Sequence, residues 1–317
     1  MIYVGLKDYK KAAAVLDALI AAYPRDLAFR RRLAEFYTSI GEEAAAQKIY
    51  AEILKIDPTD TQARLAAVGK PKPGSETDFL QKLQPLFADP GVSLDAKIKD
   101  VAPYLEKLRA HNEPALAEAL LQLAKLAENA HPKDAKAWAL SGDIYFLSGR
   151  PAEALPRYRQ CIALNATVFA VWENTMGILA DLGDMGALYE TAARAMDDFP
   201  NQALAAYYFG LAANALGKPK EAQNPLEQAV LMTGADLRLR LDVIGELAQS
   251  LILQKEYQKA AARLESVLPK GGDQHAGILE RYGDAQLGLG NREKALEYWK
   301  KAQTVQPSPR LTQKLNN

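Results

Sequence analysis

The side chains that most often carry out chemistry are few and scattered in this sequence of 317 residues. Cys161 is the only cysteine, so the chain can form neither an intrachain disulfide nor a thiolate metal cage. The three histidines, His111, His131 and His275, have no second histidine or cysteine at the spacing of a metal site. We therefore predict no metal centre, solvent-exposed or capping histidines, and a packed rather than reactive Cys161 thiol.

Motifs for nucleotide binding and hydrolysis are also missing. The segment Lys270–Asp273 contains two glycines but lacks the following lysine and hydroxyl residue of a phosphate-binding loop, so it is predicted to be a turn. No serine lies in a nucleophile elbow. The carboxylate pairs Glu42–Glu43 and Asp197–Asp198 are adjacent, so their side chains point in different directions on a helix. These observations predict a protein that is not an enzyme and that uses no cofactor.

The composition excludes further classes of function. The chain has 39 basic and 39 acidic residues, and this balance argues against binding to nucleic acid or to an anionic membrane surface. The longest apolar run, 12–23, is interrupted by Asp17 and is shorter than the roughly 18 residues of a membrane span. Hydrophobic residues make up 49% of the chain, and much of this fraction is alanine, which favours helices packed through small side chains.

The elements that would position any functional residue are short helices in a recurring pattern. The segment 138–166 predicts two such helices joined by a turn at 148–150. Its small and apolar landmarks are Trp138, Gly142, Tyr145, Ala154, Tyr158 and Cys161. A similar pattern returns at intervals of about 34 residues. The later landmarks include Trp172, Gly183 and Ala195, then Phe209, Gly210, Gly217, Ala222 and Leu226, then Tyr282, Gly283, Gly290, Ala295 and Trp299.

These landmarks resemble those of the tetratricopeptide repeat, although Ser141 and Ala166 depart from the pattern. The resemblance implies an all-α fold, a right-handed superhelix of stacked helical hairpins, over a single solenoid of residues 1–317. Residues 1–25 would be a half repeat, 26–68 a regular repeat and the start of the next, 69–133 degenerate repeats, 134–307 regular repeats, and 308–317 a C-terminal cap. Because a half repeat leaves its apolar face uncovered, we expect further sequence upstream of Met1.

In the resembled family, the first helix of each hairpin lines a concave groove that holds a peptide or a partner helix. This register predicts a set of partner-binding residues: Arg31, Arg109, Asp143, Glu173, Asp181, Tyr207, Asn214, Gln249, Glu280 and Asp284. The carboxylates and amides beyond about residue 143 would suit a ligand of basic or mixed character. An acidic residue after the landmark glycine is common in such repeats, so each of these charges is also compatible with simple solvation. Tyr207 could anchor a ligand or could pack within the repeat.

The resemblance therefore favours a non-catalytic scaffold or adaptor with a protein or peptide partner. One alternative is a docking or regulatory part of a larger polypeptide, which could be anchored in the cell envelope, and the incomplete first repeat suggests this alternative. Another is a helical-repeat RNA binder, against which the charge balance argues. Among compartments, the resemblance favours the bacterial cell envelope over the cytoplasm.

Overall fold

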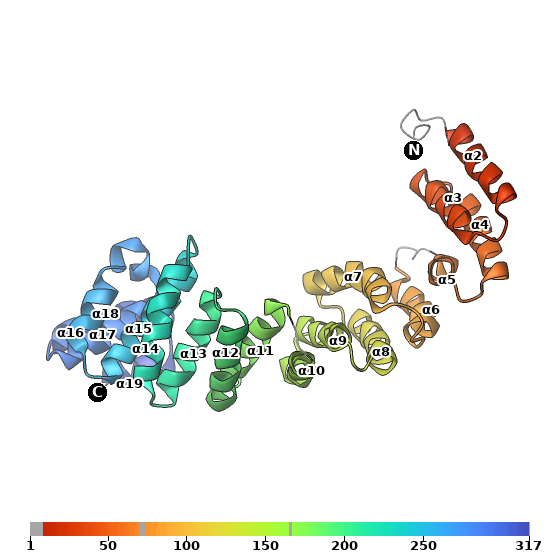
Figure 1. Ribbon diagram of the computed structural model, residues 1–317. Helices are drawn as coiled ribbons and strands as arrows, with labels where there is room; N and C mark the ends of the chain where they lie inside the picture. Colours follow the sequence, from red (N-terminus) through yellow and green to blue (C-terminus); the bar gives the residue numbers. More distant parts are fainter. Residues whose placement is uncertain (1–8, 70–73, 165–166, 317) are drawn as a thin grey trace. The chain divides into compact units, whose positions relative to one another are not determined.

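The computed structural model describes residues 9–69, 74–164 and 167–316. Over these residues the chain forms 18 α-helices and two short 3-10 helices, and it forms no strand (Figure 1). The predicted all-α class is therefore confirmed. None of the described helices is both long and apolar enough to cross a membrane. The helices belong to two compact units, an N-terminal unit that ends at Leu164 and a C-terminal unit that begins at Asn165.

Nine of the described helices lie in the N-terminal unit. They are α2 (Tyr9–Ala22), α3 (Leu27–Ser39), α4 (Glu43–Ile56), α5 (Thr61–Val68), α6 (Glu76–Phe87), α7 (Leu94–His111), α8 (Pro114–Ala130), α9 (Ala135–Leu147) and α10 (Pro151–Ala163). The pairs α3–α4 and α9–α10 pack closely as antiparallel hairpins, whereas α6 packs mainly against α8.

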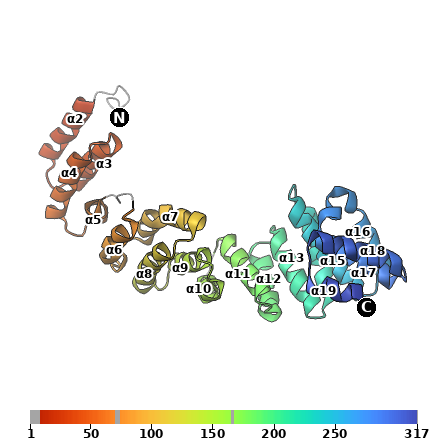
Figure 2. The same cartoon turned by 180° about the vertical axis from the view of Figure 1, so that it is seen from behind.

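The C-terminal unit is built from four successive hairpins and a final helix. The hairpins are α11 (Phe169–Asp181) with α12 (Met185–Asp198), α13 (Ala203–Ala215) with α14 (Pro219–Met232), α15 (Leu237–Leu253) with α16 (Tyr257–Glu265), and α17 (Ala276–Gly288) with α18 (Arg292–Val305). Two 3-10 helices, η1 (Leu268–Lys270) and η2 (Gly272–Gln274), precede α17, and α19 (Pro309–Asn316) ends the described chain. The first helices α13, α15 and α17 pack side by side (Figures 1 and 2).

Local sequence signals explain where these helices begin and end. Asp134 and Asp184 accept hydrogen bonds from backbone amides in the first turns of α9 and α12, as N-cap residues do. Pro151 occupies the first turn of α10, where the missing amide hydrogen costs nothing. In the turn between α11 and α12, Gly183 has a φ of 71°, a left-handed conformation that favours glycine.

Close packing within the hairpins α9–α10 and α17–α18 depends on a glycine of the first helix. A Cβ atom built on Gly142 would lie 2.6 Å from the Tyr158 ring, and one built on Gly283 would lie 2.5 Å from the Trp299 ring. Both aromatic residues are buried and belong to the second helix of the same hairpin. The glycines therefore allow two helices to approach until a large side chain fills the space between them.

The hairpin α17–α18 is covered by α19. Leu311 of α19 is 2% exposed and packs with Leu279 and Trp299 in one apolar cluster. Helix α19, which packs mainly against α18, thus covers this apolar cluster with a short helix whose other residues are largely polar.

Candidate partner-binding surface

Two neighbouring tyrosines of α13 form the centre of a polar surface in the C-terminal unit. The ring centroids of Tyr207 and Tyr208 are 5.2 Å apart, and both side chains are half-buried. Across the ranges that the structure describes, neither hydroxyl has a hydrogen-bonding partner. The Tyr208 hydroxyl lies beside Gly177 of α11, 3.4 Å from the position of a Cβ on that glycine. Both phenols are therefore available to hydrogen-bond a ligand.

The charges of three carboxylates act on Tyr208. Burial raises the pKa of this tyrosine, and the negative charges of Glu173, Asp181 and Asp242 raise it further. Glu173 and Asp181 are exposed on α11, and neither pairs with a cation of the described chain. Acidic groups of two first helices, α11 and α15, thus influence one tyrosine of α13. We call the set of Glu173, Asp181, Tyr207, Tyr208 and Asp242 the tyrosine–carboxylate surface.

Asp242 has a hydrogen-bond partner that carries no charge. The Nδ1 atom of His275 accepts the Ile278 amide at 3.3 Å at the start of α17. Its proton must then be on Nε2, which donates to Asp242 Oδ1 at 3.0 Å. The predicted capping role of His275 is confirmed, and the negative charge of Asp242 is not neutralised by this imidazole.

A buried polar network beneath this surface joins three first helices. Asn214 of α13 donates to the main-chain oxygen of Glu246 at 2.9 Å and to its Oε2 at 3.2 Å. Ser250 donates to Asn214 Oδ1 at 2.8 Å, and Arg281 of α17 donates to Glu246 Oε1. Asn214 is only 7% exposed and Glu246 only 4%. The network therefore fixes how α13, α15 and α17 pack, and the amide of Asn214 is already occupied within the chain.

Glu246 and Arg281 also set the charge near Tyr207. Burial raises the pKa of Tyr207, the carboxylates of Glu246 and Asp242 raise it further, and the Arg281 guanidinium lowers it. The sequence patterns do not single out Glu246, Ser250 or Arg281. The repeat register assigns them to first helices, but nothing in the sequence shows that they meet.

Glu280 and Asp284 lie four residues apart on α17 and face the same way, as the helical register predicts. Their carboxylates already hold a cation of the chain itself. Lys314 of α19 places Nζ 2.7 Å from Glu280 Oε1 and 2.6 Å from both carboxylate oxygens of Asp284. Arg310 adds a 3.0 Å ion pair to Glu280. Each of the two acidic side chains is 15% exposed.

The predicted residues of the N-terminal unit lie on separate helices. Arg31 of α3 donates through Nε to Asp60 Oδ2 at 2.7 Å, and Asp60, 4% exposed, is the N-cap of α5. Arg109 of α7 forms an exposed ion pair with Glu106 of the same helix. The structure therefore shows an inter-helix bond for Arg31 and only a local one for Arg109.

Asp143 and Gln249 are both half-buried on first helices. Asp143 of α9 accepts a hydrogen bond from the Tyr158 hydroxyl at 2.8 Å, and burial raises the pKa of this carboxyl. Gln249 lies on α15. Of the ten predicted residues, Glu173, Asp181 and Tyr207 lie on the adjacent first helices α11 and α13.

The possible metal ligands and the single cysteine can be compared with the predictions made for them from the sequence. Among the described residues, no three or more histidine, cysteine, aspartate or glutamate side chains come together as a metal ion would require. Cys161 is buried, and burial raises the pKa of its thiol to about 11, in agreement with the predicted packed thiol.

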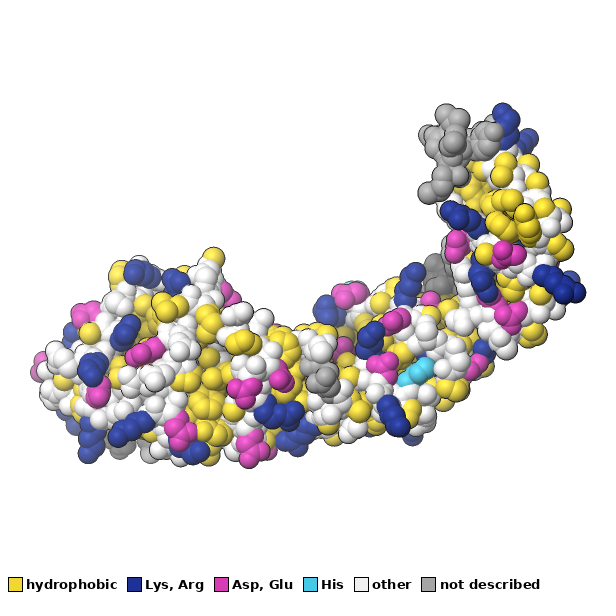
Figure 3. All heavy atoms as spheres, viewed as in Figure 1, with side chains coloured by type: hydrophobic (Ala, Val, Ile, Leu, Met, Phe, Trp, Pro, Cys, Tyr) yellow, Lys and Arg dark blue, Asp and Glu magenta, His cyan; other side chains and the backbone are white. Residues whose placement is uncertain are grey.

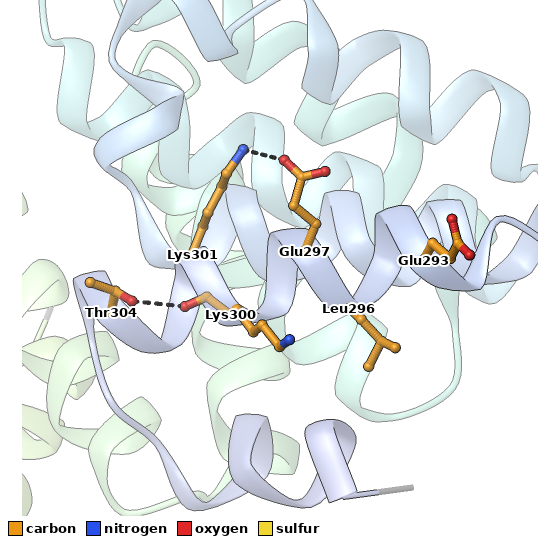
Figure 4. A pocket seen from close by; sticks show the side chains of 6 residues that line it. All are labelled: Glu293, Leu296, Glu297, Lys300, Lys301 and Thr304. Atoms are coloured by element: carbon orange, nitrogen blue, oxygen red, sulfur yellow. Dashed lines mark hydrogen bonds and ion pairs between the residues drawn. The ribbon is translucent and has the colours of Figure 1, made fainter.

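The outer face of α18 is a shallow depression of charged side chains (Figure 4). Lys301 pairs there with Glu297 at 2.6 Å, and Leu296 lies between the charged groups. Acidic and basic side chains are likewise interspersed over the visible face of the C-terminal unit (Figure 3). A solvated surface of this kind suits the end of a helical stack.

Sequence models of the Tetratricopeptide repeat match residues 3–68, 135–167 and 276–309. No match was found among curated proteins. Among solved structures, the chain is similar to pilF of Pseudomonas aeruginosa, with 22% identity, a TM-score of 0.50, and coverage of 70% of this chain and 96% of that one. At this identity the similarity shows the fold alone.

Two further solved structures have lower TM-scores. The first is YrrB, described as a TPR protein with an unusual peptide-binding site, with 19% identity, a TM-score of 0.47, and coverage of 61% of this chain and 97% of that one. The second is the APC/C hetero-tetramer Cut9–Hcn1, with 14% identity, a TM-score of 0.49, and coverage of 99% of this chain and 74% of that one. The helical hairpins and the matching repeat models together show that this chain belongs to the tetratricopeptide repeat family.

Proposed function

We propose that this protein is a non-catalytic interaction scaffold that binds a segment of a partner protein along the first helices of its C-terminal unit. The observation that carries the proposal is the tyrosine–carboxylate surface. Half-buried aromatic rings with free hydroxyls lie beside exposed charges there, and tyrosine is enriched at protein interfaces because it offers a large apolar area with a polar tip.

The arrangement of the helices supports the same proposal. The polar network of Glu246, Asn214 and Arg281 holds α13, α15 and α17 in a fixed relation before any partner binds. A rigid surface loses little conformational entropy on binding, so a partner segment would gain affinity from contacts made with a surface that is already formed.

Substitutions of Glu280 and Asp284 would be poor tests of partner binding. Because Lys314 already pairs with both carboxylates, charge reversal at these positions would repel α19 and disturb the end of the hydrophobic core. We therefore place the expected contact nearer to Glu173, Tyr207 and Asp242.

The proposal can be tested with random peptides displayed on phage and selected against the full chain. Hydrogen–deuterium exchange should then show that a selected peptide protects α11, α13 and α15, the helices that carry the tyrosine–carboxylate surface. Protection confined to the second helices α12, α14 and α16 would contradict the proposed function.

A further inference from the structure

His131, at the end of α8 in the N-terminal unit, lies between a cation and a main-chain oxygen. Its Nε2 atom is 2.8 Å from Lys97 Nζ and 3.1 Å from the main-chain oxygen of Val92. Lys97 is 0% exposed and also donates to the main-chain oxygens of Phe87 and Asp89, at 2.9 and 2.8 Å. One ring nitrogen thus faces both a donor and an acceptor, and the hydrogen that it carries or lacks decides which of the two it bonds.

The protonation state of the imidazole selects between these two bonds. A neutral His131 with its hydrogen on Nδ1 accepts from Lys97, which then has an acceptor for each of its three ammonium hydrogens. A protonated His131 carries hydrogens on both ring nitrogens, so Nε2 donates to the Val92 oxygen instead. Lys97 then loses one acceptor and lies beside a second positive charge, while its own side chain is out of contact with water.

We propose that the Lys97–His131 contact is a pH-sensitive switch, which holds the end of α8 against the start of α7 at neutral pH and loosens this junction when His131 binds a proton. Histidine is the side chain whose charge ordinarily changes between about pH 5 and 8, so the switch acts in the mildly acidic range. His131 is partly exposed, and a proton therefore reaches it without unfolding of the unit. The bond gained to Val92 does not offset the repulsion, because the two cations lie 2.8 Å apart at a largely dry site.

The charges on the elements packed at this junction do not neutralise a protonated His131. Among the described residues, Asp89 is the carboxylate whose charge acts on Lys97, and Arg64 already pairs with it. Asp95 of α7 pairs with Lys136 of α9. The other charged side chains near His131 along α8 and the following turn are Glu128, Lys133 and Asp134. None of these carboxylates forms an ion pair with His131 in the described ranges, and Asp134 caps α9.

Two carboxyl groups of the same unit act in the opposite direction. Burial raises the pKa of Asp100 on α7 and of Asp143 on α9. A carboxyl whose pKa is raised in the folded chain binds its proton more readily there, so it stabilises the unit as the pH falls. The switch must therefore be tested by comparing variants at the same pH, since these two groups are common to all of them.

Hydrogen–deuterium exchange of the full chain at pH 7.5 and pH 5.0, expressed as protection factors, measures the junction. The amides at the start of α7 and at the end of α8 should lose about tenfold in protection at the lower pH. The variant His131→Gln keeps an acceptor oxygen and does not titrate, so the same amides should lose less than about twofold. His111→Gln, at an exposed histidine of α7, is the matched control and should lose as much as the unaltered chain.

An unchanged protection in the unaltered chain, or an equal loss in His131→Gln, would overturn the inference. The tautomer provides a second test that needs no substitution. Nitrogen NMR of the histidine-labelled chain at pH 7.5 should show the hydrogen of His131 on Nδ1, with His275, whose hydrogen is on Nε2, as the reference for the other tautomer. A hydrogen on Nε2 of His131 at this pH would mean that the imidazole does not accept from Lys97, and the switch would not exist.

Discussion

The Nζ atom of Lys97 lies 2.8 Å from the Nε2 atom of His131, in the interior of the N-terminal unit. Nζ also donates to the main-chain oxygens of Phe87 at 2.9 Å and Asp89 at 2.8 Å. The two main-chain oxygens accept two of the three ammonium hydrogens. Nε2 of His131, which also lies 3.1 Å from the Val92 main-chain oxygen, accepts the third in the tautomer that carries its hydrogen on Nδ1. This lysine joins the end of α6 and the start of α7 to the turn between α8 and α9.

Replacement of this lysine by methionine should strongly destabilise the N-terminal unit. Lys97→Met nearly keeps the volume of the side chain but leaves the main-chain oxygens of Phe87 and Asp89 without this donor, in a site where the lysine is 0% exposed. We expect a loss of about 3 kcal/mol in the free energy of unfolding, since buried polar groups without partners are costly. Urea denaturation followed by circular dichroism measures the loss, and hydrogen exchange should place it in α6, α7 and α8. A change below about 0.5 kcal/mol would show that the three bonds add nothing.

The same lysine should make stability depend on pH. Burial lowers the pKa of Lys97 below its ordinary value of 10.5, and the nearby Asp89 only partly offsets this. Between the lowered pKa and 10.5 the unfolded chain binds more protons than the folded chain, so the free energy of unfolding gains a contribution that rises with pH. The difference in unfolding free energy between the unaltered chain and Lys97→Met should therefore be larger at pH 9.5 than at pH 7. A constant difference across this window would contradict the prediction.

Two glycine-to-alanine changes should have opposite effects in the C-terminal unit. Gly283→Ala places a Cβ atom 2.5 Å from the Trp299 ring and 3.0 Å from the Ala295 oxygen, so we expect a loss of about 2 kcal/mol through overpacking. Gly177→Ala places its Cβ 3.4 Å from the Tyr208 hydroxyl, an ordinary contact, and should gain up to about 1 kcal/mol in helix propensity. Thermal melting of the two variants tests both directions at once, and equal effects would refute the packing argument.

The buried bond between Glu246 and Arg281 should show strong coupling. Glu246→Ala leaves the guanidinium of Arg281 without its carboxylate and removes one of the two acceptors of the Asn214 amide, and we expect a cost of about 3–5 kcal/mol. The double variant Glu246→Leu/Arg281→Met removes both charges and should recover much of that loss. A double-mutant cycle with the single variants Glu246→Leu and Arg281→Met measures the coupling, and additive effects of these two single changes would show that the pair is not coupled.

Two lysines provide a matched comparison of a half-buried ion pair with an exposed one. Lys314→Gln leaves Glu280 and Asp284, each with a side chain 15% exposed, without their shared cation. We expect a loss of about 1–2 kcal/mol and earlier exchange of the α19 amides. Lys301→Gln removes only the exposed pair with Glu297, where solvent screening should leave no measurable change (Figure 4). Equal effects would show that the position of α19 does not depend on Lys314.

The sequence was sufficient to predict the hairpins, because their landmarks are close together along the chain. Gly142 and Tyr158 are sixteen residues apart, as are Gly283 and Trp299, and in the structure each glycine packs on its aromatic partner. Such contacts follow from helical periodicity and from one short turn. The same register identified Tyr207 and Glu173 as residues of successive first helices, and their role in partner binding stays a prediction.

The tertiary structure alone decided which charges are already paired. The sequence assigned Glu280 and Asp284 to an open groove, but Lys314 covers both, and it assigned no role to Lys97, which is fully buried. Periodicity states which face of a helix a residue occupies, whereas an ion pair depends on the distance between side chains of different helices. That distance is set by packing between repeats, in which small differences in helix length and side-chain volume decide whether two charges meet.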